Sequence, residues 1–188
     1  MEENNNPGAP QPDLIDKVIA AESGARQPEG VTRLLMVNVA VLWSLFQLWI
    51  SSPIPYWVAE LDSGLQKYVM FNDSMARSIH LSFAVFLVYL AFPLWNRSPR
   101  KYVPLYDWVL ALVATFCAAY LFLFYEALSG RQGAPTGRDI GVAIVGVLTL
   151  LEACRRCLGK PMMIMGIICL VYVFAGRHMP DLIAHKGA

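Results

Sequence analysis

The chain has 188 residues, of which 56% are hydrophobic and 15% are charged, and its mean hydropathy is +0.46. A water-soluble core of this size does not need so much apolar surface. The formal net charge of +1 provides no basic field for nucleic acid, so the composition excludes a nucleic-acid-binding protein and favours an integral membrane protein.

Residues 1–33 are predicted to form a cytoplasmic N-terminal tail. Met1–Pro12 is rich in Asn and Pro, a composition typical of disorder. Residues 14–19 carry apolar side chains at helical spacing behind Asp13, a residue type that caps helices. This pattern indicates either a short amphipathic helix or a frayed tail. The first 30 residues lack the apolar stretch of a cleavable signal peptide, so we expect none.

Five apolar stretches contain no Asp, Glu, Lys or Arg. About 20 residues of helix cross the roughly 30 Å of hydrocarbon in a bilayer, and flanking aromatic and Arg side chains extend most of the stretches to that length. We therefore expect an all-α membrane protein, a bundle of about five transmembrane helices. The stretches are Leu34–Ile50, Ser78–Leu94, Val109–Tyr125, Ile140–Leu151 and Pro161–Ala175.

The distribution of Lys and Arg between the predicted spans gives an orientation. Nine of these residues fall on the side of the N-terminus and six on the other, and cytoplasmic segments carry the excess. We therefore expect a cytoplasmic N-terminus and an external C-terminus. The nine are Lys17, Arg26, Arg33, Arg97, Arg100, Lys101, Arg155, Arg156 and Lys160, and the six are Lys67, Arg77, Arg131, Arg138, Arg177 and Lys186.

The first external loop is predicted to hold an amphipathic helix over Tyr56–Val69. Apolar side chains recur there at helical spacing, with polar ones on the opposite side, which is typical of a helix lying in the membrane interface. The helix is either a docking platform for an external partner or a lid that rests on the membrane. The candidate docking residues are Trp57, Glu60, Asp62 and Lys67.

Carboxylates stand where the predicted spans begin. Asp73 or Ser74 precedes the second span, and Asp107 precedes the third. Thr136 and Asp139 have the spacing of a capping box before the fourth. Because carboxylates are also stabilised by the positive end of a helix dipole, we interpret them as caps rather than as catalytic groups.

Two charged clusters are candidate structural ion pairs. Arg77 and His80 begin the second span on the side where Glu126 ends the third. Glu152 precedes Arg155 and Arg156 by three and four residues, so one helix brings these side chains together. A proton or ion relay requires ionisable groups near the membrane midplane, and the apolar stretches contain no carboxylate.

The residue inventory does not support an enzyme, a cofactor or a metal site. Cys154 and Cys157 form a C-x-x-C motif without a second ligand pair, so we interpret the four Cys residues as free thiols that pack like small hydrophobic residues. His80 alone is near a span, whereas a bis-His haem requires paired histidines, and no Gly-rich phosphate loop, G-x-S-x-G or H-E-x-x-H occurs.

Small and polar residues inside the spans are expected to serve helix packing. Gly141, Ala143 and Gly146 allow helices to approach closely. We expect polar side chains of the first span to form hydrogen bonds between helices, with the lining of a cavity as the alternative. These polar residues are Asn38, Ser44 and Gln47.

Several runs of sequence, in order and together covering roughly residues 14–188, resemble the N-terminal region of fused TRAP transporter permeases. The closest resemblance is to the subfamily that works with TAXI-type substrate-binding proteins. The runs are ESGARQPEG (22–30), WSLFQLW (43–49), ARSIHLSFAVFL (76–87), YDWVLAL (106–112), FYEAL (124–128) and LLEACRRCLGKPMMIMGIICLVYVFAGRHMPDLIAHKGA (150–188).

The resemblance implies a sodium-driven secondary transporter of the bacterial or archaeal cytoplasmic membrane, in which an external binding protein delivers an organic anion, such as a carboxylate, to the permease. On this pattern residues 34–158 form the small four-helix domain, and residues 159–188 form a connecting transmembrane helix and an external segment. The expected partners are the large permease subunit, the TAXI-type binding protein and the bilayer. The sodium gradient would be used by the large subunit, so we expect no cofactor in this chain.

Fused permeases continue beyond the equivalent of HKGA into the large transport domain, so we expect this chain to be either a separate small subunit that scaffolds the large one or a fragment of a fused permease. The alternative of a different class is a membrane anchor for a redox or other enzyme complex. Bound haem or quinone would favour that alternative.

Overall fold

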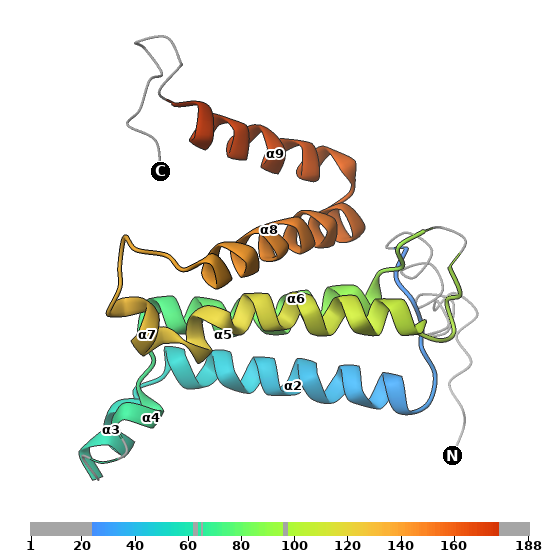
Figure 1. Cartoon of the computed structure of the whole chain (residues 1–188). Helices are drawn as coiled ribbons and strands as arrows, with labels where there is room; N and C mark the ends of the chain where they lie inside the picture. Colours follow the sequence, from blue (N-terminus) through green and yellow to red (C-terminus); the bar gives the residue numbers. More distant parts are fainter. Residues whose placement is uncertain (1–23, 62–63, 65, 96–97, 177–188) are drawn as a thin grey trace, which may run out of the picture.

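The structure is a computed structural model that describes residues 24–61, 64, 66–95 and 98–176. Every regular element in these ranges is a helix, and the long helices lie side by side (Figure 1). The amphipathic segment predicted over residues 14–19 lies outside the described residues. The helices are α2 (Val31–Ser51), α3 (Ile54–Leu61), α4 (Gln66–Val69), α5 (Asp73–Ala91), α6 (Leu105–Leu123), α7 (Tyr125–Ser129), α8 (Gly137–Leu158) and α9 (Lys160–Ala175).

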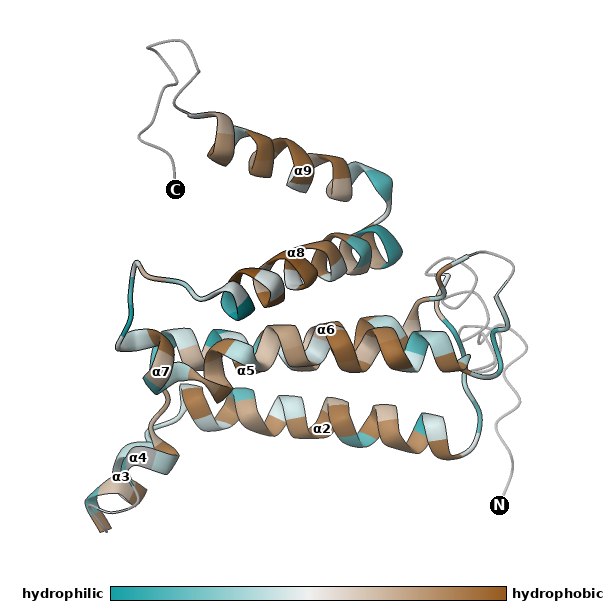
Figure 2. Ribbon diagram, in the orientation of Figure 1, coloured by the Kyte–Doolittle hydropathy of each residue, from teal (hydrophilic) through white to brown (hydrophobic). Residues whose placement is uncertain are grey.

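The prediction of an all-α membrane protein is confirmed. Within the described residues, α2, α5 and α6 are long and apolar enough to cross a membrane. Hydrophobic residues, shown in brown in Figure 2, occur along the length of these helices. The apolar helix α9 has 16 residues, about 24 Å at 1.5 Å per residue, and α8 carries charged residues in its first and last turns. Spans four and five therefore stay predictions.

The pair α5 and α6 forms the centre of the bundle. Helix α2 packs against α5, α8 packs against both α5 and α6, and α9 packs against α8. Alanines on α6 and α8 are buried in this core, and small residues let helices approach closely in membrane proteins. The buried apolar residues of this core are Val85, Tyr89, Leu90, Val103, Ala111, Ala114 and Ala153.

The connections between helices gather at two opposite ends of the bundle. The segment before α2, the loop between α5 and α6, and the turn between α8 and α9 lie at one end, and α3, α4 and α7 lie at the other (Figure 1). The turn from α8 to α9 passes through Gly159, whose φ of 87° is a conformation that glycine adopts without strain. The two ends correspond to the two sides that the Lys and Arg distribution separates.

The helix starts differ in part from the predicted ones. Thr136 and Asp139 form the predicted capping box at α8. The cap of α5 is Asn72 rather than Asp73 or Ser74, and its side chain accepts a hydrogen bond from the Met75 backbone N–H at 2.8 Å. The prediction of Asp107 as a cap is wrong, because it lies inside the first turn of α6, after Pro104.

The predicted helix over Tyr56–Val69 is divided into two. Helix α3 begins at Ile54 and ends at Leu61. Pro55 lies in its first turn, where proline is tolerated because the backbone N–H groups there have no partner within the helix. Gly64 lies in a turn before α4 begins at Gln66. Glycine is a poor helix former because it loses more backbone entropy than other residues, which accounts for the break at this point of the apolar pattern.

Gly146 is a close-approach site between α8 and α6, as predicted, whereas Gly141 is not. A Cβ atom at Gly146 would lie 3.3 Å from the Cβ of Cys117, while a Cβ at Gly141 would have no atom within 4 Å. We expect Gly146→Leu to lower the free energy of unfolding by about 1–3 kcal/mol through overpacking. Thermal unfolding in detergent measures this, and Gly141→Leu is the matched control, with an expected change within about 0.5 kcal/mol. Equal melting temperatures for the two variants would contradict the close approach.

Candidate functional site

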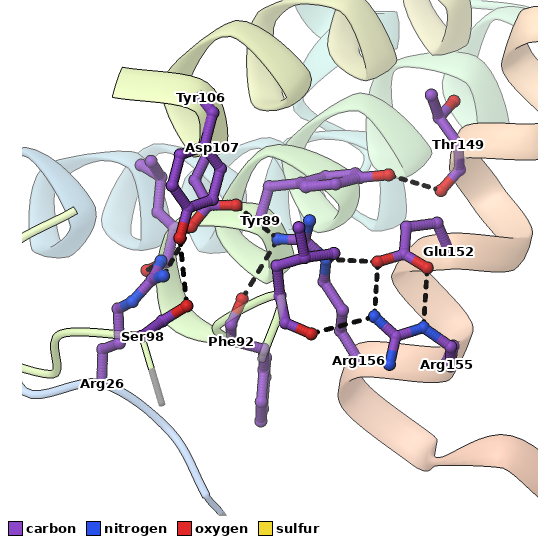
Figure 3. A network of polar contacts seen from close by, with 12 residues as sticks. Arg26, Tyr89, Phe92, Ser98, Tyr106, Asp107, Thr149, Glu152, Arg155 and Arg156 are labelled. Carbon is purple, nitrogen blue, oxygen red and sulfur yellow. Dashed lines mark hydrogen bonds and ion pairs between the residues drawn. The ribbon is translucent and has the colours of Figure 1, made fainter. Parts of the chain in front are cut away.

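Two buried arginines meet one buried carboxylate at the end of the bundle where α6 begins. Arg26, in the segment before α2, places Nη2 2.5 Å from Oδ2 of Asp107, and Arg156, near the end of α8, places Nη1 2.7 Å from Oδ1 (Figure 3). All three side chains are 0% exposed. Both oxygens of Asp107 are therefore paired with a cation, which compensates for burying its charge.

The contacts continue along α8 to Glu152. Arg155 donates to both oxygens of Glu152 at 2.7 Å, and Arg156 donates to Oε1 at 2.9 Å, as the spacing of three and four residues predicts. Burial alone would raise the pKa of Glu152, which lies beyond the apolar stretch of α8, but the hydrogen bonds from the two arginines lower it below its usual value. We call Arg26, Asp107, Glu152, Arg155 and Arg156 the charged junction.

Tyr89 of α5 packs at the centre of the charged junction. The guanidinium carbon of Arg156 lies 4.5 Å from the centre of the Tyr89 ring, a distance at which a cation is attracted to the ring face. The Tyr89 hydroxyl donates to the carbonyl of Thr149 at 2.8 Å (Figure 3). Through this one side chain α5 is joined both to α8 and to the arginine that holds Asp107.

Backbone hydrogen bonds fix the segment that carries Arg26. Its N–H donates to the Ala91 carbonyl at 2.7 Å, and the N–H of Gln27 donates to the Arg100 carbonyl at 3.2 Å. From α8, Arg155 donates to the Leu94 carbonyl at 3.1 Å. The charged junction thus connects three segments that are far apart in the sequence.

The charges of the junction do not balance. Three guanidinium groups face two carboxylates, and Nη2 of Arg156 is buried without a hydrogen-bond partner in the described residues. Each carboxylate contacts two arginines, so the junction keeps at least one ion pair on each carboxylate if either Arg155 or Arg26 is lost. Loss of Asp107 removes the carboxylate that two buried cations share, and it leaves Arg26 without a carboxylate partner among the described residues.

A smaller polar cluster surrounds Asp139 at the opposite end of the bundle. The Tyr120 hydroxyl donates to its carboxylate at 2.5 Å, and Arg131 pairs with it at 3.0 Å. Hydrogen bonds from Tyr120 and from Thr136 lower the pKa of Asp139 well below its usual value. Arg138 donates to the Tyr120 hydroxyl and stacks over Phe124, 4.8 Å from the ring centre. The cluster fixes the start of α8 against the end of α6.

Two of the four predicted docking residues, Trp57 and Glu60, lie on α3. Trp57 is 62% exposed and Glu60 is exposed on α3, so both are open to a partner. The backbone of Lys67 belongs to α4, while its side chain and all of Asp62 lie outside what the structure describes. Trp49 at the end of α2 donates to the Val69 carbonyl at 3.2 Å and so holds α4 against the bundle.

The predicted grouping of Arg77, His80 and Glu126 is not formed between these side chains. Arg77 pairs with Asp73 one helical turn earlier, at 2.8 Å, with both side chains more than three-quarters exposed. His80 faces α2, where its Nδ1 accepts a hydrogen bond from the Trp43 indole at 3.2 Å. Residues four apart on a helix are neighbours, so Asp73 supplies an ion-pair partner for Arg77 within α5 and no partner from another helix is required.

The described residues contain no group of three or more His, Cys, Asp and Glu side chains that could hold a metal ion. Cys117, Cys154, Cys157 and Cys169 are all free thiols. Of the charged junction, only the Glu152 part was identified from the sequence. The available sequence signals for Asp107 and Arg26 were an Asp at the start of an apolar stretch and an Arg on the same predicted side of the membrane.

Comparison with protein-family models, with curated proteins and with solved structures finds no match for this chain.

Proposed function

We propose that this chain is the small membrane subunit or domain of a TRAP-type secondary transporter for organic anions. In this proposal it scaffolds the large transport subunit in the cytoplasmic membrane and helps an external TAXI-type binding protein to dock. The proposal is supported by the ordered runs that resemble the N-terminal region of fused permeases, and by the all-helical membrane fold of the chain.

The strongest support for the proposal is that the charged side chains lie at the ends of the bundle and not within the apolar stretches. The five apolar stretches contain no Asp, Glu, Lys or Arg, and the charged junction and the Asp139 cluster lie at the two ends of the bundle. A polypeptide that moves ions or anions normally places ionisable groups at membrane depth. Charges that join helices at their ends instead are suited to a scaffold, in which the partner subunit performs transport.

Docking would use the end of the bundle that carries α3 and α4. Trp57 and Glu60 offer an exposed aromatic side chain beside an exposed carboxylate, and aromatic residues are enriched at protein interfaces while charges direct the encounter. The Lys and Arg distribution assigns this end to the outside, where a binding protein would approach.

Uptake by reconstituted liposomes tests the proposal. The sodium concentration is higher outside the liposomes, and an organic anion and a cognate binding protein are added to the outside. We expect no uptake by liposomes that contain this chain alone, and uptake when the large subunit is added. In the complete system Glu60→Lys should weaken the response to binding protein without changing the sodium dependence, because the exposed charge contributes to encounter and not to ion binding. Asp73→Lys, an exposed charge at the start of α5, is the matched control. Uptake by the isolated chain would refute the scaffold role, and an unchanged response of Glu60→Lys would refute docking at α3.

A further inference from the structure

The segment before α2 packs against the bundle through every second residue. Arg26 and Pro28 are buried, whereas Gln27 and Glu29 are exposed. This alternation is typical of an extended segment, in which successive side chains point to opposite sides. We call residues 25–29 the clasp.

Backbone hydrogen bonds attach the clasp to the loop before α6. The N–H of Gln27 donates to the Arg100 carbonyl at 3.2 Å, and the N–H of Glu29 donates to the Lys101 carbonyl at 3.2 Å. Lys101 and Glu29 also form an ion pair at 3.8 Å, but both side chains are at least three-quarters exposed, so solvent weakens it. The buried side chains of the clasp are therefore its main attachment.

A glycine flanks the clasp on each side. Gly24 and Gly30 have φ values of 66° and 64°, in the left-handed region that glycine adopts without strain. A Cβ atom at either position would meet no atom within 4 Å, so neither glycine is packed against the bundle. The chain can therefore pivot at both ends of the clasp without disturbing a packed contact.

The side chain of Arg26 meets acceptors that all belong to α5, α6 and the loop between them. Its guanidinium donates to Oδ2 of Asp107 at 2.5 Å, and also to the Pro99 carbonyl at 3.2 Å and the Leu90 carbonyl at 3.5 Å. Leu90 lies in the last turn of α5, where the carbonyls form the negative end of the helix dipole. Three acceptors around a fully buried cation match the several N–H donors of a planar guanidinium. We call these three acceptors the guanidinium site.

The guanidinium site keeps a cation partner if Arg26 leaves it. Asp107 is still paired with Arg156, whose Nη1 lies 2.7 Å from Oδ1. Helices α5 and α6 pack against each other, and α8 packs against both, through their own residues. The bundle can therefore keep its fold while the clasp is detached.

We infer that the clasp is a detachable ligand of the bundle, and that residues 25–29 carry Arg26 into and out of a site that binds a guanidinium group. When the clasp is detached, the guanidinium site is open to an arginine side chain from a partner chain. Arg26 competes with that side chain, because its tether gives it a high effective concentration at the site. The inference does not depend on the proposed function.

Chemical rescue of Arg26→Ala tests the inference in the purified full-length chain. We expect the variant to fold, because Asp107 keeps Arg156, and to melt below the wild type. Methylguanidinium at millimolar concentrations should raise its melting temperature saturably, by about 3 °C at tenfold above half-saturation, because it binds the folded state. Methylurea, which has nearly the same shape and no charge, is the matched ligand control and should not rescue.

Two further proteins control for the site itself. The wild type should not respond to methylguanidinium, because Arg26 fills the guanidinium site. The double variant Arg26→Ala, Asp107→Asn should not respond either, because its site lacks the carboxylate that a cation requires.

Hydrogen exchange of the wild-type chain tests the detachment directly. The backbone N–H groups of Gln27 and Glu29 should exchange together and at least roughly tenfold faster than those of α5, because the clasp opens while the helices stay folded.

Failure of Arg26→Ala to fold would overturn the inference, because Arg26 would then be part of the folded core and not a ligand of it. An absent response to methylguanidinium, an equal response to methylurea, or an undiminished response of the double variant would each show that the acceptors do not form a guanidinium site. Exchange of Gln27 and Glu29 only together with α5 would show that the clasp does not detach.

Discussion

Asp107→Asn is expected to destabilise the protein by about 3–5 kcal/mol, because a buried ion pair broken on one side leaves an uncompensated charge. The substitution removes the carboxylate shared by Arg26 and Arg156, and all three side chains are fully buried. Arg156 keeps Glu152 as a partner, whereas among the described residues Arg26 keeps the backbone carbonyls of Leu90 and Pro99. Thermal or denaturant unfolding in detergent measures the loss.

The matched control for Asp107→Asn is Asp73→Asn. Asp73 also pairs with an arginine, but its side chain is 77% exposed, so this substitution should cost less than about 1 kcal/mol. Adding Arg26→Met to Asp107→Asn removes the unpaired cation and should restore part of the stability. If Asp107→Asn costs no more than Asp73→Asn, the charged junction does not hold the bundle together.

Tyr89→Ala is expected to cost about 3–5 kcal/mol, the range for removing a fully buried aromatic side chain. The change creates a cavity between α5 and α8 and removes the ring beneath Arg156. Tyr89→Phe keeps the ring and loses only the hydrogen bond to Thr149, so it should cost about 1 kcal/mol. Unfolding of both variants, with Tyr68→Ala on an exposed ring as the control, measures the difference. Equal losses for the Phe and Ala variants would mean that the hydroxyl, and not the packing of the ring, determines the contribution of Tyr89.

The features that the sequence predicted well depend on local pattern. Apolar stretches without charges identify membrane helices because the bilayer excludes unpaired polar groups. The capping box of Thr136 and Asp139 and the contacts of Glu152 with Arg155 and Arg156 follow from spacings of three and four residues within one helix. Each of these needs no knowledge of how the helices pack.

The charged junction was only partly predictable because its main contact is distant in the sequence. Arg26 and Asp107 are separated by 81 residues, and an Asp near the start of a helix has the same local pattern whether it caps the helix or binds an arginine. The Lys and Arg distribution did assign the segment before α2, the loop after α5 and the end of α8 to one side. This grouping reduces the possible partners of Asp107 to the few arginines on that side, but it does not identify which of them form the ion pairs.

The external amphipathic segment shows a different limit. Its apolar spacing runs from Tyr56 to Val69 without interruption, so periodicity alone predicts one helix. Gly64 lies within this pattern at a position where the chain turns, and a single glycine is tolerated in many helices. The partner of Arg77 was also mispredicted. The carboxylate of Asp73 lies one helical turn away and pairs with Arg77, but the sequence pattern had assigned Asp73 to helix capping.

We propose that the charged junction faces the cytoplasm and that α3 and α4 face the outside, where a binding protein can dock, as the Lys and Arg distribution predicts. Labelling intact cells with a membrane-impermeant thiol reagent tests it most directly, using Tyr102→Cys in the loop after α5 and Gln132→Cys in the loop before α8, with the wild-type chain as background. Both positions are exposed. The loops that carry them lie at opposite ends of the bundle (Figure 1). We expect position 132 to react in intact cells and position 102 to react only after the membrane is opened. Reaction of position 102 in intact cells, with position 132 protected, would contradict it.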